Sequence, residues 1–96
     1  MNRIEHLLTC LAEEAAEVQQ AVFKALRFGL DDGYPGTTRT NCGDIVDEVT
    51  DLLAIVQMLQ ESSMLPPSVG YQGDIDEKKC KVIKWMLYAE EKGMLK

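Results

Sequence analysis

The sequence predicts an all-α protein with three main helices and two intervening loops. Two observations support this: apolar residues recur at spacings of three and four, and the Gly, Pro and Asp clusters that break helices lie between these periodic segments. The 96 residues have room for one domain, residues 1–96. A chain of this size buries only about 60–65% of the surface that its unfolded form exposes, so association with another copy would stabilise it.

The first helix is expected to run from residue 2 or 3 to Phe28, with Gly29 as its C-terminal stop. Its apolar stripe comprises positions 4, 8, 11, 15, 18, 22 and 25. At about 1.5 Å per residue the helix is roughly 40 Å long, more than two shorter helices of one chain can cover. Further apolar residues lie outside the stripe, namely Leu7, Ala21, Leu26 and Phe28. These features predict a homodimer or homotetramer in which two copies of the first two helices form a four-helix bundle.

Residues 30–40 are expected to form a loop, because the Asp-Gly and Pro-Gly pairs favour turns. A second helix should begin near Asn41, which can cap it, and end at about Ser62, ahead of Pro66. Its expected core stripe comprises Ile45, Val49, Leu52, Val56 and Leu59.

A third helix is expected to start at Asp74, read as an N-cap with Glu77 as its capping-box partner. It should continue to about Lys92 and be stopped by Gly93. Glycine is favoured at this position because it adopts the left-handed conformation that commonly ends a helix.

The composition of the sequence argues against several classes of function. The net charge of −6 argues against a general nucleic-acid binder, which would be basic. The three cysteines, Cys10, Cys42 and Cys80, form neither a disulfide framework nor a C-x-x-C metal site, which favours a reducing cytoplasm. No apolar run approaches the roughly 18 residues of a membrane-spanning helix, so no membrane partner is expected.

Two pairs of acidic residues are the strongest functional signal. Glu14 and Glu17 lie three residues apart on the first expected helix, and Glu48 and Asp51 do so on the second. Both pairs lie on partly apolar flanks, and no Lys or Arg lies within one turn of any of the four. A metal ion is therefore their simplest partner, and ligands made of oxygen alone favour Mg²⁺ or Mn²⁺ over zinc and iron. The alternative is that these are two ordinary acidic helix faces.

The order Glu13-Glu14-x-x-Glu17 and then Glu48-x-x-Asp51 resembles the signature of the MazG-like, all-α nucleoside triphosphate pyrophosphohydrolases. The resemblance covers about the whole chain and implies Mg²⁺-dependent hydrolysis of an NTP or dNTP to the monophosphate and pyrophosphate. It also implies that Glu14, Glu17, Glu48 and Asp51 hold the metal and that the nucleotide lies between subunits. The rival hypothesis is a non-catalytic helical dimerisation module that binds a divalent ion for stability.

Three residues of the first helix are further candidates. Glu13 could orient or deprotonate the attacking water, although a solvated glutamate explains it equally well. Lys24 and Arg27 follow Glu17 along the helix and could bind phosphates. The alternative is that these cations lie at the helix C-terminus because they interact favourably with its dipole.

The third expected helix carries Lys78, Lys81, Trp85 and Tyr88 along one stripe. Lysines followed by aromatic residues could contact phosphates and then a base. Trp and Tyr at helical spacing are more often packing or interface residues, and this second interpretation leads here.

Overall fold

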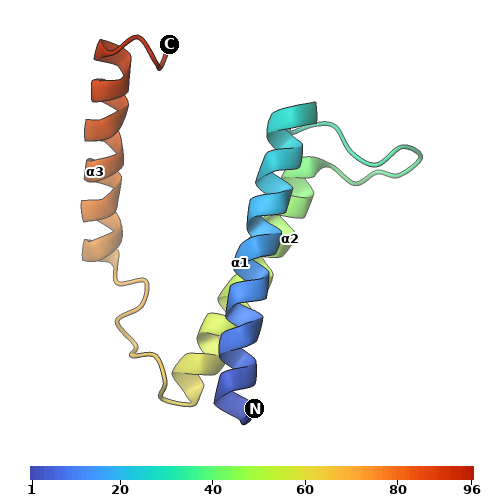
Figure 1. Cartoon of the computed structure of the whole chain (residues 1–96), viewed down its shortest axis with the longest axis vertical. Helices are drawn as coiled ribbons and strands as arrows, with labels where there is room; N and C mark the ends of the chain where they lie inside the picture. The colour runs from blue at the N-terminus through green and yellow to red at the C-terminus, as the bar shows by residue number, and fades with distance from the viewer. The chain divides into compact units, whose positions relative to one another are not determined.

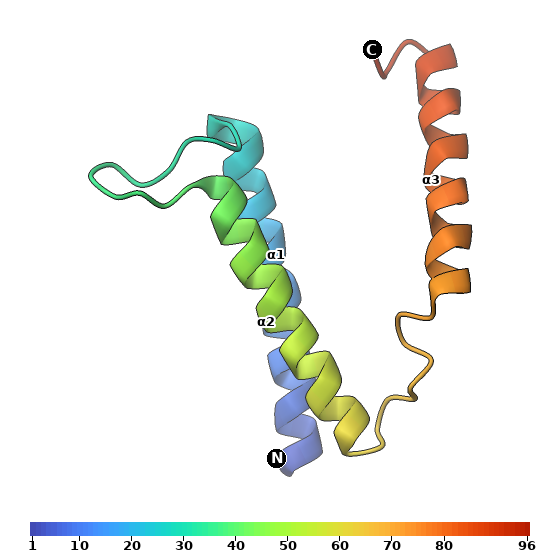
Figure 2. The ribbon, with the colours of Figure 1, turned by 180° about the vertical axis from the view of Figure 1, so that it is seen from behind.

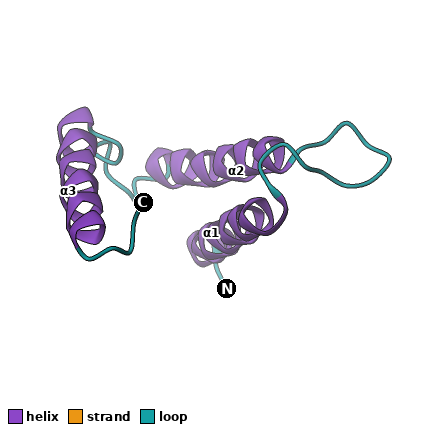
Figure 3. Cartoon of the chain, turned by 90° about the horizontal axis from the view of Figure 1, so that it is seen from above, coloured by secondary structure: helices purple, strands orange, loops and turns teal.

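The computed structural model describes all residues, 1–96, and contains three α-helices and no strand (Figures 1 and 3). They are α1 (Arg3–Phe28), α2 (Asn41–Glu61) and α3 (Gln72–Glu91). The all-α prediction and the number of helices are confirmed. No helix combines the length and the apolar character needed to cross a bilayer. The chain divides into two compact units, Met1–Leu65 and Pro66–Lys96.

Both ends of α1 are fixed by local hydrogen bonds. Asn2 caps the helix: its side chain accepts from the Glu5 backbone N–H at 2.8 Å, and the Glu5 carboxylate accepts from the Asn2 N–H at 3.3 Å. At the other end Gly29 has φ +99° and donates its N–H to the Ala25 carbonyl at 2.8 Å. The predicted glycine stop is therefore confirmed.

The N-cap of α2 is Thr40, so the expectation that Asn41 caps this helix is wrong. The Thr40 hydroxyl accepts from the Gly43 backbone N–H at 3.0 Å. Asn41 is the first helical residue and is buried, and its side-chain amide donates to the Gly29 carbonyl at 2.8 Å. Because the Thr40 hydroxyl caps α2, the side-chain amide of Asn41 is not needed as a cap. It is available for the hydrogen bond that links α2 to the end of α1.

α1 and α2 lie side by side and run in opposite directions (Figures 1 and 2). The buried and half-buried residues on the two helices recur at alternating spacings of three and four, the pattern of a seam between paired helices. On α1 they include Ile4, Leu7, Leu11, Glu14, Val18, Ala21 and Ala25. On α2 they include Asn41, Ile45, Glu48, Leu52, Ile55 and Leu59.

The predicted stripe of α1 is correct at positions 4, 11, 18 and 25 and wrong at positions 8, 15 and 22, which are exposed. α2 packs against the neighbouring edge, so Leu7 and Ala21 are buried in their place. On α2, Val49 was expected in the core and is 37% exposed. Each helix therefore keeps a second, exposed apolar face.

The unit Pro66–Lys96 contains α3, whose N-cap is Tyr71 and not Asp74 as expected. The Tyr71 carbonyl accepts from the backbone N–H groups of Asp74 and Ile75, each at 3.1 Å, so Asp74 lies within the first turn of the helix and does not precede it. The helix ends at Glu91 and is followed by Gly93 with φ +74°, close to the predicted stop.

Candidate metal centre

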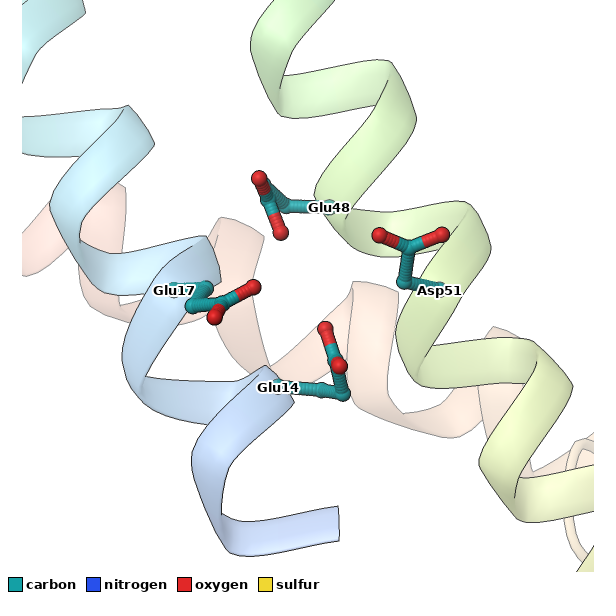
Figure 4. Close-up of side chains that lie close together, drawn as sticks. All are labelled: Glu14, Glu17, Glu48 and Asp51. Carbon is teal, nitrogen blue, oxygen red and sulfur yellow. The ribbon is translucent and has the colours of Figure 1, made fainter. Parts of the chain in front are cut away.

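The structure brings together the four acids that the sequence singled out. Glu14 and Glu17 come from α1, and Glu48 and Asp51 from α2; one carboxylate oxygen of each lies within 4.8 Å of the corresponding oxygens of the other three. Figure 4 shows the carboxylates directed into the space between the two helices. Opposite ligands of one Mg²⁺ are about 4.2 Å apart, so the cluster has the dimensions of a single-ion site.

The cluster interrupts an otherwise apolar seam. Glu14 and Glu48 occupy seam positions and are half-buried, whereas Glu17 and Asp51, each one turn further along its helix, are exposed. The cluster is thus closed on the side of the helix interface and open on the other. A ligand can approach the exposed side without separating the helices.

Two carboxylate oxygens of the cluster are buried without a partner. Oε2 of Glu14 and Oε2 of Glu48 accept no hydrogen bond. A buried charged oxygen without a donor is costly, and no basic side chain forms an ion pair with any of the four acids. A hard divalent cation would supply the missing positive charge, so the residues fit such an ion.

The electrostatics of the cluster favour protonation when no cation is present. A hydrogen bond with Glu17, then burial and the repulsion of neighbouring carboxylates, raises the pKa of Glu48 to about 7. This hydrogen bond exists only when one of the two groups is protonated, because two carboxylates have no donor between them. Burial, followed by repulsion from Glu17 and Asp51, also raises the pKa of Glu14. Crowded, partly desolvated carboxylates are typical of functional sites.

A cavity of about 300 Å³ adjoins the cluster and is lined by Glu17, Glu48, Lys24 and Arg39, among others. Lys24, which was predicted from the sequence, therefore lines the same cavity as two of the acids. Arg39 was not predicted from the sequence. It lies at the end of the loop between α1 and α2, and its guanidinium forms a 2.6 Å ion pair with Asp44. The one sequence signal for Arg39 is that it is the single cation among residues 30–40.

Glu13 and Arg27, the other candidates on α1, lie outside this cavity. Glu13 is exposed and lies outside the group of four mutually close carboxylates. The Arg27 guanidinium carbon lies 4.8 Å from the centroid of the Phe28 ring, an arrangement that stabilises the exposed end of the helix.

The candidates on α3 lie together within their own unit. Lys78, Lys81 and Trp85 line a cavity of about 450 Å³, and the Trp85 ring packs edge-on against Tyr88 at 5.6 Å between centroids. Lys81 also pairs with Glu77 at 3.5 Å. Their contact with a substrate stays a prediction.

The site is defined by its own residues: four carboxylates on an antiparallel helix pair, next to a cavity with two cations. Each helix contributes two ligands separated by one turn, which is the arrangement the two acidic motifs predict. Comparisons with protein-family models, with curated proteins and with solved structures found no match for this chain.

Proposed function

We propose that this protein is a Mg²⁺-dependent nucleoside triphosphate pyrophosphohydrolase, which converts a (d)NTP and water to the (d)NMP and pyrophosphate. The observation that carries the proposal is the cluster of four carboxylates, two of them with buried and unpartnered oxygens, beside the cations Lys24 and Arg39. The bond cleaved, between the α and β phosphates, is inferred from the resemblance of the two acidic motifs to the MazG-like enzymes.

In this proposal Glu14, Glu17, Glu48 and Asp51 hold Mg²⁺ or Mn²⁺. A bound divalent cation offsets the negative charge of the phosphates that react. Lys24, at the wall of the adjoining cavity, donates hydrogen bonds from its ammonium group to phosphate oxygens.

Glu13 is proposed to accept a proton from the attacking water. It is exposed, adjoins Glu14 in the chain and is outside the ligand set, so it is free to act as a base. The water oxygen forms a bond to phosphorus, the phosphoanhydride bond breaks, and pyrophosphate leaves with the bridging oxygen.

The active species is proposed to be a homodimer or a homotetramer. The helix pair leaves apolar side chains exposed on both helices, including Leu8 at 45%, Leu26 at 76%, Val46 at 58% and Leu53 at 54%. A second helix pair would cover these faces in a four-helix bundle. Sedimentation at micromolar concentration should therefore give a mass of at least twice 10.8 kDa. A fully active monomer would contradict this part of the proposal.

The rival function, a non-catalytic dimerisation module stabilised by a divalent ion, predicts the same association but no turnover. The two are separated by incubating the full chain with dNTPs and Mg²⁺ and measuring pyrophosphate and orthophosphate. Release of pyrophosphate supports the enzyme. Unchanged nucleotide supports the rival, and orthophosphate alone would indicate a different phosphatase.

Isosteric variants connect turnover to the carboxylates. Glu14→Gln, Glu17→Gln, Glu48→Gln and Asp51→Asn should each abolish Mg²⁺-dependent turnover while circular dichroism still shows folded helices, because each removes one charged ligand at nearly constant volume. Glu61→Gln, at the far end of α2, is the matched control. Wild-type activity in any two of the four variants would refute the site.

A further inference from the structure

The loop between α1 and α2 has a backbone conformation that is fixed by hydrogen bonds. Its two arms are joined by backbone hydrogen bonds, from the Asn41 N–H to the Asp32 carbonyl at 2.6 Å and from the Cys42 N–H to the Leu30 carbonyl at 2.9 Å. A Cβ atom added at Gly33 would lie 1.7 Å from the Arg39 carbonyl oxygen. Only glycine allows the two arms to approach this closely, and the residue at this position is a glycine, Gly33.

The tip of the loop is also held in place. The Thr37 backbone N–H and its hydroxyl both donate to the Tyr34 carbonyl, at 3.2 and 2.8 Å, and Gly36 provides the left-handed residue of the turn with φ +81°. These contacts fix the backbone on either side of Pro35. Figure 1 shows the loop extending from the end of the helix pair where α1 stops and α2 begins.

The loop and the adjoining ends of α1 and α2 line an open cavity of about 660 Å³. Its apolar walls are Phe28, Tyr34 and Pro35, and Asp32 and Thr37 contribute polar groups. This volume lies within the range of about 300–1,000 Å³ that is typical of small-molecule sites, as does the combination of aromatic walls with a few polar groups.

This aromatic cavity adjoins the cavity beside the carboxylates, because the two share part of their lining. Lys24, Arg39 and Asp44 line both. The two cations therefore line both cavities, whereas the carboxylates of Glu17 and Glu48 line only the first and the rings of Phe28 and Tyr34 only the second. Arg39 keeps donors for a ligand although it pairs with Asp44, because a guanidinium has five N–H groups and this side chain is 66% exposed.

We propose that the loop cavity binds the base and sugar of the nucleotide, with Phe28 and Tyr34 packing against the base, while Arg39 binds phosphate together with Lys24. The inference deepens the proposed function and rests on it. From the first cavity to the second, the lining changes from carboxylates and cations to cations and aromatic rings, and a nucleoside triphosphate likewise has its phosphates at one end and a heteroaromatic base at the other. Bases pack against aromatic side chains through their π-faces, whatever the base. The inference assigns the base to the helix pair and its loop and not to Trp85 on α3.

The test measures two constants for the full-length chain with Mg²⁺: KM for a dNTP, and Ki for inorganic triphosphate as a competitive inhibitor that has no base. Tyr34→Ala should raise KM about tenfold and leave Ki unchanged, because a base–aromatic contact is lost and no phosphate contact is. Tyr34→Phe should keep KM within about twofold of wild type, since the ring remains. Arg39→Ala should raise both KM and Ki, because phosphate is common to the two ligands.

The matched control is Tyr71→Ala, which removes a similarly exposed tyrosine from the other unit and should change neither constant. An unchanged KM in both Tyr34→Ala and Phe28→Ala, with normal wild-type turnover, would overturn the inference and leave the proposed function intact. An equal rise of KM and Ki in Tyr34→Ala would also overturn it. Absence of nucleotide turnover in the wild-type chain would overturn both.

Discussion

The raised pKa of Glu48 leads to a quantitative prediction for metal binding. Mg²⁺ requires the carboxylate in its ionised form, so protons compete with the metal for this residue. With a pKa of about 7, Glu48 is roughly one-tenth ionised at pH 6 and roughly nine-tenths ionised at pH 8. The apparent Mg²⁺ affinity should therefore fall about tenfold from pH 8 to pH 6. The raised pKa of Glu14 acts in the same direction.

Isothermal titration calorimetry of the metal-free chain with Mg²⁺ measures this effect in two ways. The dissociation constant should rise as pH falls, and at pH 7 about half a proton should be released per ion bound, seen as a dependence of the heat on the buffer's ionisation enthalpy. Glu61→Gln, which alters an acid outside the cluster, should keep both features. Glu48→Gln should abolish most binding and with it the proton release.

A dissociation constant that is independent of pH between 6 and 8, or Mg²⁺ binding without proton release, would refute this prediction. Either result would mean that Glu48 is ionised before the metal arrives. The hydrogen bond between Glu48 and Glu17, which is the largest cause of the raised pKa, would then be absent from the metal-free protein.

Two further predictions concern catalysis and packing. Lys24→Ala should raise KM about tenfold with little change in kcat, because a phosphate contact kept from ground state to transition state affects binding most; an unchanged KM for every substrate would exclude Lys24 from the site. Leu59→Ala should lower the free energy of unfolding by about 2–5 kcal/mol, because this side chain is fully buried. Urea denaturation of Leu87→Ala, at an exposed position on α3, serves as the comparison and should differ from wild type by less than about 1 kcal/mol. A similar small loss for Leu59→Ala would show that the seam is not packed as described.

The helices and the acid pairs could be predicted from the sequence because both depend on local periodicity. Gly29 and Gly93 stop their helices as expected, and the spacing of three residues in each motif brings the carboxylates to one side. Local spacing does not decide which of two apolar edges faces the neighbouring helix. Leu7 and Leu8 are both apolar, and only the packing of α2 shows that Leu7 is the buried one.

The start of α3 and the role of the loop could not be predicted from the sequence, and the reasons differ. Asp74 has the sequence features of an N-cap, yet the observed N-cap is Tyr71, three residues earlier, where a preceding turn ends. Arg39 carries no motif at all. It reaches the cavity beside the carboxylates because Gly33 lets the two arms of the loop meet, which is a contact between residues six positions apart in an irregular segment.

The positions of Glu14 and Glu48 within the seam affect the register in which the two helices pair. If one helix slid along the other by one turn, about 5.4 Å, these carboxylates would face aliphatic side chains, for example Glu14 opposite Leu52 and Glu48 opposite Val18. A charged group moved against an apolar surface without a partner loses much of its hydration, so such shifted pairings are strongly disfavoured. Leucines at the same positions would tolerate several alignments, as uniform apolar seams do. The two glutamates therefore specify a single register for the helix pair, with or without a bound ion.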